Sequence, residues 1–191
     1  IKELDALIVC GGTGPDPRGT STAGLIPCSD SKAFKCACGD SSAGERIIGS
    51  QYASSTLYVN KAAGEMLFGV NFADGRIKGY GTSQPSGKKK TFFVQCVRGA
   101  TAYGKNSFKD NGDGTISDKA TGLTWEQADS GKGMTWKDAL ARAQSKNAAK
   151  YLGKTDWRLP SAKELQSIVD YTRSPDTTSS AAIDPLFKAS K

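Results

Sequence analysis

Histidine is absent from this chain of 191 residues. Because histidine is the commonest general base and a frequent zinc ligand, its absence excludes the usual His-assisted nucleophiles and the mixed Cys/His zinc sites. A serine or cysteine nucleophile would need another activating base. Cys36 and Cys38 also lack the Cys-x-x-Cys spacing of redox motifs. We therefore expect the protein not to be an enzyme.

Long apolar runs are also missing. No stretch approaches the roughly 20 apolar residues that a membrane-spanning helix needs, so we expect no transmembrane segment. The 22 glycines are scattered among short apolar runs. This distribution is typical of short strands joined by tight turns.

Acidic residues are absent from Gly75 to Lys109, although this stretch holds eight basic ones and the chain carries a net charge of +7. Two interpretations stay open: a solvated basic face with a flexible lysine-rich loop, or a surface that binds an anionic glycan. Nucleic acid is not an expected partner, because no recognised binding motif accompanies the charge. The candidate glycan-binding residues are Lys88, Lys89, Lys90, Arg98 and Lys105.

The five cysteines all lie in the first half of the chain, at Cys10, Cys28, Cys36, Cys38 and Cys96. Disulfides in an oxidising compartment are the expected use. Cys28 could pair with Cys36 or Cys38 and close a small loop, whereas Cys10 could reach Cys96. An odd number leaves one thiol free or paired with another chain, and the sequence leaves the connectivity open.

The chain repeats part of itself. Residues 1–9 match residues 162–170 around a shared Lys-Glu-Leu. Two weaker matches follow in the same order, Gly14–Asp16 with Ser174–Asp176 and Leu25–Pro27 with Ile183–Pro185. Three matches in one order indicate a tandem repeat that the ends of the chain cut through. We expect the later part of one copy at 1–100, a linker at 101–106 and the first part of the next copy at 107–191.

Local patterns predict short elements of both kinds. A capping box from Ser161 to Glu164 begins one helix, whose apolar face holds Ala162, Leu165, Ile168 and Val169. Thr135 begins another, with a buried stripe of Trp136, Ala139, Leu140 and Ala143. Hairpins are expected over 66–80 and 115–126, and a largely buried strand over 91–98. The predicted fold class is α+β, with short, mostly antiparallel strands and two helices per copy.

Three sets of motifs together resemble the Lcl C-terminal domain family, named after a Legionella collagen-like surface protein. The family's opening motif is resembled by residues Asp110–Asp118 and Ala120–Trp125 of this chain. Its middle motif is resembled by Thr155–Pro160 and Lys163–Leu165. The end motif is similar to Tyr52–Thr56, Val70–Arg76 and Val94–Gly99. The end motif comes first in this chain, as expected for a window across the junction of two tandem domains.

The resemblance implies a C-type-lectin-like fold split across two tandem copies. It also implies an extracellular or cell-surface setting in a bacterium, often with adhesion or carbohydrate binding. We expect either a structural protein whose copies complete one another head-to-tail into a fibre, or a stand-alone module that binds anionic polysaccharide. Copies of the chain itself are therefore the first expected partner.

The acidic loop at 110–118 suggests a calcium site, since calcium takes several oxygen ligands from flexible loops. The candidate ligands are Asp110, Asn111, Asp113 and Asp118. Lys109 and Ala120 stand where a calcium loop would carry ligands, so a hairpin turn rich in Asp and Asn is the alternative. No other cofactor is expected. Trp125, Trp136 and Trp157 could stack on sugars, although core packing better accounts for Trp136 and Trp157.

Overall fold

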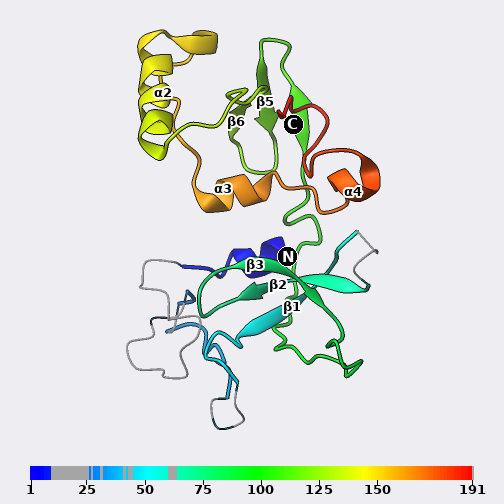
Figure 1. Ribbon diagram of the computed structural model, residues 1–191. Coiled ribbons are helices and arrows are strands. Elements are labelled where there is room, and N and C mark those ends of the chain that lie inside the picture. The colour runs from blue at the N-terminus through cyan, green and yellow to red at the C-terminus, as the bar shows by residue number, and fades with distance from the viewer. Residues whose placement is uncertain are drawn as a thin grey trace. The chain divides into compact units, whose positions relative to one another are not determined.

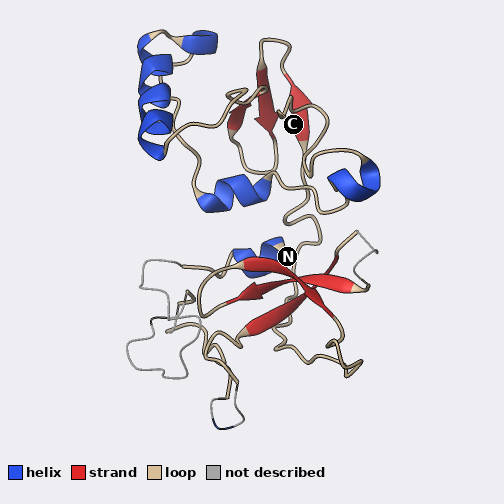
Figure 2. Ribbon diagram, in the orientation of Figure 1, coloured by secondary structure: helices blue, strands red, loops and turns tan. Residues whose placement is uncertain are grey.

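The computed structural model describes residues 1–9, 26, 28–30, 32–40, 42, 45–59 and 64–190. The chain divides into two compact units, Ile1–Thr101 (unit 1) and Ala102–Lys191 (unit 2). Each unit holds a three-stranded antiparallel sheet together with short helices (Figure 1, Figure 2). The fold class is therefore α+β, as predicted.

Unit 1 contains α1 (Lys2–Asp5) and a sheet of order β1-β2-β3. Its strands are β1 (Gln51–Leu57), β2 (Met66–Asn71) and β3 (Ile77–Gly81). The predicted hairpin over 66–80 is confirmed by the pairing of β2 with β3. Gly75 in its turn has a φ of 72°, which side chains disfavour and glycine adopts freely.

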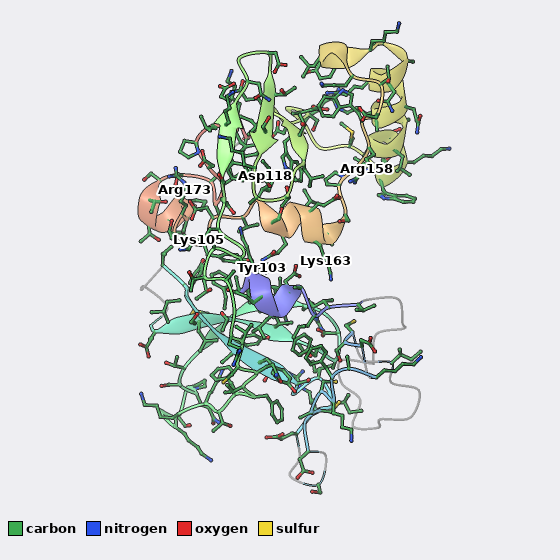
Figure 3. The ribbon with its side chains drawn as sticks, turned by 180° about the vertical axis from the view of Figure 1, so that it is seen from behind. Tyr103, Lys105, Asp118, Arg158, Lys163 and Arg173 are labelled. Atoms are coloured by element: carbon green, nitrogen blue, oxygen red, sulfur yellow. The ribbon has the colours of Figure 1, made fainter. Side chains whose placement is uncertain are left out.

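The core of unit 1 lies between α1 and the sheet, which are side by side in Figures 1 and 3. Leu4 of α1 is only 7% exposed, and Val70 of β2 is fully buried. Tyr52 of β1 meets Phe72 edge-on, with ring centroids 4.8 Å apart. The amine of Ile1 donates to Oγ1 of Thr56 in β1 over 3.1 Å, which fixes the start of the helix on the sheet.

The predicted buried strand over 91–98 is wrong. Only Phe93 pairs with β1: its N–H donates to the Gln51 carbonyl, and its carbonyl accepts from Ala53. Beyond it the chain leaves the sheet, and Val94 and Val97 are 69% and 74% exposed. The segment has the composition of a strand, but a strand also needs a neighbouring strand to pair with. Beyond Phe93, none of the described residues pairs with it.

Unit 2 contains a sheet of order β4-β5-β6 and four helical segments. The strands are β4 (Phe108–Asp110), β5 (Thr115–Asp118) and β6 (Thr124–Glu126). The helical segments are α2 (Trp136–Ala148), η2 (Tyr151–Gly153), α3 (Ala162–Ser167) and α4 (Pro175–Thr178). The predicted hairpin over 115–126 is confirmed by the pairing of β5 with β6.

Both helix starts in unit 2 are as predicted. The Thr135 hydroxyl accepts from the Asp138 N–H at the start of α2, and Ser161 and Glu164 form the full capping box of α3. Such caps satisfy amides that the helix itself leaves without partners. None of the described helices is both long and apolar enough to cross a membrane.

The buried stripe predicted for α2 is wrong, and the apolar face predicted for α3 is only partly buried. On α2, Trp136 and Leu140 are 76% and 40% exposed, and Ala139 and Ala143 are only half-buried. On α3, Leu165 is 50% exposed and Ala162 is also exposed, whereas Ile168 beyond its end is buried. Periodicity predicted the helices, but burial also needs an element on the other side, and the described residues of unit 2 supply none at these positions.

The sheet of unit 1 should be sensitive to one glycine. A Cβ at Gly69 would lie 2.6 Å from the Tyr52 carbonyl oxygen, so we expect Gly69→Ala to cost about 1–3 kcal/mol by overpacking. At Gly79 a Cβ would meet only the flexible end of Met66 at 3.3 Å, so Gly79→Ala is the matched control. Amide hydrogen exchange of unit 1 measures both, and equal protection in the two variants would contradict this account.

Candidate functional site

An open apolar groove of about 710 Å³ lies in unit 2. It is bounded by β6, α2, the segment 154–160, α3 and the C-terminal residues 183–189. Its apolar wall includes Trp125, Met134, Trp157, Leu159, Leu165 and Phe187. Its volume falls within the range of ordinary binding pockets. The groove is thus the main candidate for a functional surface.

Asn147 on α2 anchors the segment that forms one wall. Its side-chain amide donates to the Trp157 carbonyl over 2.9 Å, and its side-chain oxygen accepts from the Trp157 N–H over 2.7 Å. The Trp157 indole N–H donates in turn to the Tyr151 carbonyl over 2.9 Å. These three bonds hold Trp157 in place, so its ring forms part of a fixed wall.

Lys146 joins α2 to the sheet across the base of the groove. Its side chain is 10% exposed, and Nζ lies 2.5 Å from Oε2 of Glu126 on β6. The same Nζ lies 3.7 Å from the centroid of the Tyr151 ring, within the range of a cation–π contact. Because a buried charge is costly unless it is paired, these contacts hold the helix and the sheet in one arrangement.

Arg158, which is labelled in Figure 3, and Glu164 at the start of α3 both line the groove. The guanidinium donates to both carboxylate oxygens over 2.8 and 2.5 Å, and the same carboxylate accepts from the Ser161 N–H over 2.7 Å. The Arg158 guanidinium and the amide of the capping box together lower the pKa of Glu164 from 4.5 to about 2. The carboxylate is therefore ionised at neutral pH and fixes the start of α3.

Trp125 on β6 has a polar atom without a partner. Its indole N–H is buried and meets no acceptor in the described part of the chain. Leaving a buried donor unsatisfied costs about 1–3 kcal/mol. Indole N–H groups in buried positions normally find a partner, so this donor is an exception in a residue that lines the groove.

The proposed calcium ligands are engaged in hydrogen bonds within the sheet β4-β5-β6 and its turns, and Asp110 also accepts from the side-chain amide of Gln127. Asp110 accepts from the Gly112 N–H, Asp113 accepts from the Thr115 N–H and hydroxyl, and Asp118 accepts from the Ala120 N–H. Asn111 bonds to the hydroxyls of Thr115 and Ser117. Within the described ranges, no cluster of three or more His, Cys, Asp or Glu side chains could hold a metal ion. The geometry is that of a hairpin turn, and calcium binding stays a prediction.

The basic candidates are exposed, but they belong to two bodies. Lys88, Lys89, Lys90 and Arg98 lie in unit 1, and Lys105 lies in unit 2. The three lysines end an ordered turn, because the Gln84 N–H donates to the Lys88 carbonyl and the Lys90 N–H donates to Thr82. The structure therefore gathers four of the five residues in one unit.

Four of the five cysteines are described, all as thiols. Cys28 is buried, Cys36 and Cys38 are half-buried, and Cys96 is exposed. Partial burial raises the pKa of the Cys38 thiol, and the adjacent Cys36 thiol raises it further. Cys10 lies outside the described residues. Disulfide pairing therefore stays a prediction.

Sequence reasoning identified the motif around Trp157 but not the roles of its neighbours. Arg158 was part of the quoted motif, yet its pairing with Glu164 was not predicted. The contact of Lys146 with Glu126 had no sequence signal, since the two residues lie 20 positions apart on a helix and a strand. Only the capping box, a local pattern, placed Glu164 correctly.

The comparisons with known proteins add one match. Residues 114–189 match the model of the Lcl C-terminal domain family. This range covers β5, β6, α2, α3 and therefore every wall of the groove. No curated protein and no solved structure matches the chain.

The ion pair of Glu164 predicts a pH dependence. Since the pKa of the folded state lies below 4.5, the carboxylate stabilises unit 2 above pH 4.5, and this contribution is lost as the pH falls toward about 2. Glu164→Gln should lower the stability of unit 2 at neutral pH and flatten its decline between pH 4.5 and 2. Tryptophan fluorescence during urea unfolding reports on unit 2, because all three tryptophans lie there. An unchanged pH profile in the variant would contradict the assignment.

Proposed function

On the premise that residues 114–189 match the model of the Lcl C-terminal domain family, we propose that the protein is a non-enzymatic structural or adhesive protein of a bacterial surface. Its units are parts of tandem C-type-lectin-like domains, and it acts outside the cell. Copies of the chain associate head-to-tail, each supplying a surface that another lacks.

The tandem arrangement is supported by elements that recur at the matching positions. α1 (Lys2–Asp5) and α3 (Ala162–Ser167) share the Lys-Glu-Leu sequence. Shortly after each helix an isolated antiparallel bridge forms, from Ile8 to Ser29 in unit 1 and from Val169 to Ile183 in unit 2. Ile8 and Val169 occupy the same position of the sequence repeat. Helix and bridge thus recur together, as expected for two copies of one domain.

The open groove is the observation that carries the proposal. Soluble monomers rarely expose large contiguous apolar surfaces, and those that exist usually mark binding sites. Here the groove combines half-exposed apolar side chains with the unsatisfied indole N–H of Trp125. An open apolar surface of this kind is suited to a protein partner.

The turn bearing Lys88, Lys89 and Lys90 supports the alternative, a module that binds anionic polysaccharide. All three lysines are exposed, and backbone hydrogen bonds on either side keep them on one turn. Three ordered charges give a polyanion a fixed site of attraction, which salt would screen. This property is compatible with assembly, since a fibre can display adhesive surfaces.

Self-association predicts a native mass well above the chain mass of 20.1 kDa. A head-to-tail contact is heterologous and need not close, so the mass should rise with protein concentration. Light scattering on a sizing column, with and without reductant, measures it. A single compact species near 20.1 kDa at every concentration would contradict assembly.

Polysaccharide binding predicts retention on immobilised heparin that falls as NaCl rises. Replacing Lys88, Lys89 and Lys90 together by alanine should lower the salt needed for elution, because the ordered charges are lost. The matched control replaces Lys119, Lys132 and Lys137, three exposed lysines of unit 2. If the elution salt falls equally in the two triple variants, net charge alone explains the retention, and the proposal of a specific site is rejected.

A further inference from the structure

Two cysteines of unit 1 lie with their thiols together. Cys36 and Cys38 are separated only by Ala37, and their thiols are hydrogen-bonded to each other. Both residues are half-buried, so neither is closed off from solvent. A thiol that reacts with a disulfide from solution at this position has a second thiol beside it. This is the arrangement that exchange between a dithiol and a disulfide requires.

Side chains at the start of the sheet fix the residue between the two cysteines. The Ala37 N–H donates to the Tyr52 hydroxyl over 2.9 Å, and the Ala37 carbonyl accepts from the Ser50 hydroxyl over 2.5 Å. Tyr52 is 6% exposed and Ser50 is fully buried, so the core of unit 1 holds both hydroxyls. One residue after Cys38, the Gly39 N–H donates to the Ile47 carbonyl over 3.3 Å. The segment that carries the two thiols is therefore anchored through its backbone.

Cys28 is the other partner that the sequence leaves open for this pair, and it is much less accessible. It is 6% exposed. Its N–H donates to the Phe72 carbonyl, and its carbonyl accepts from the Val9 N–H, so its backbone is fixed as well. Because exchange begins with attack on a disulfide from solution, access favours Cys36 and Cys38 over Cys28.

A disulfide between Cys36 and Cys38 is suited to exchange rather than to stabilising the fold. It closes a loop with a single residue between its ends, so it removes little entropy from the unfolded chain. Disulfides that stabilise a domain join segments far apart in sequence, whereas accessible ones are the labile kind. Loop length and accessibility both point to a bond that forms and breaks.

We propose that Cys36 and Cys38 are a reversible redox pair, which closes by exchange with a low-molecular-weight disulfide and opens again in excess thiol. First, one cysteine thiolate attacks a sulfur of the small disulfide, whose S–S bond breaks and releases one thiolate. Second, the neighbouring thiolate attacks the protein-bound sulfur of this mixed disulfide and releases the other half. The cysteines lose two electrons, the small disulfide gains them, and the cysteine protons pass to the released thiolates.

Peptide mapping of the full chain tests the pair. Trypsin cleaves after Lys35 and Arg46, so residues 36–46 form one peptide that contains these two cysteines and no other. The reduced protein is equilibrated with mixtures of reduced and oxidised glutathione, then alkylated and digested. As the share of oxidised glutathione rises, we expect peptide 36–46 to lose both alkylation sites and two hydrogen atoms. In excess reduced glutathione both alkylation sites should return.

Single variants separate the two steps. In Cys36→Ser the Cys38 thiol lacks its neighbour, so we expect the reaction to stop at a mixed disulfide of Cys38 with glutathione. Cys38→Ser should stop in the same way at Cys36. The exposed Cys96 thiol shows in every sample that the reagent is active. Circular dichroism checks that each variant is folded.

Tyr52→Phe tests whether the anchored backbone positions the thiols. The variant keeps the ring and removes the hydroxyl that accepts from Ala37. We expect the second step to slow roughly two- to tenfold, which corresponds to the loss of one hydrogen bond. Tyr58→Phe is the matched control, because Tyr58 lies just beyond the other end of β1 and its ring meets Phe68 edge-on. This control should close at the rate of the wild type.

Each part of the proposal has its own contrary result. If peptide 36–46 stays fully alkylated at every glutathione ratio, or is linked to a second peptide, the pair is rejected. A Cys36–Cys38 bond that persists in excess reduced glutathione would be structural and would overturn reversibility. Equal rates in the Tyr52 and Tyr58 variants would reject positioning by the anchored backbone. None of these results depends on self-association, so the redox pair and the proposed function stand or fall separately.

Discussion

The small size of the sheet in unit 2 limits how much apolar surface of the neighbouring helices can be buried. Its strands contain three, four and three residues, so the sheet is too small to cover the apolar faces of two helices. A helix or sheet is stable only when its apolar face packs against another layer. Ile116 on the central strand is fully buried, but Leu165 on α3 remains half exposed. The groove lies beside this half-exposed leucine.

Polar contacts keep this groove formed while its apolar wall is uncovered. Lys146 with Glu126 connects α2 to the sheet, Asn147 fixes the segment of Trp157 on α2, and Arg158 fixes the start of α3 through Glu164. Such contacts have directional geometry, unlike apolar packing, so they hold a surface in shape when packing is incomplete. A preformed surface also lowers the entropy cost of binding a partner.

Local features were predictable from sequence, and long-range burial was not. Turn chemistry identified both hairpins, and capping residues identified the starts of α2 and α3, because these signals act over three or four residues. The motifs also identified the family of residues 114–189. By contrast, the contact of Lys146 with Glu126 depends on how a helix meets a sheet, which no local pattern encodes. The buried stripe predicted for α2 failed for the same reason, since amphipathic periodicity indicates a face that needs cover without showing whether cover exists.

Two of these errors share one physical cause. The strand expected at 91–98 and the buried stripe expected on α2 both follow from local patterns, yet the described part of each unit holds no element that packs against them. When local preference and observed burial disagree, the disagreement often falls at a functional surface. Val94 and Val97 thus remain exposed beyond Phe93, and Trp136 and Leu140 remain exposed on α2. A local pattern predicts the kind of element and the face that needs cover, whereas the tertiary arrangement decides whether that face is buried.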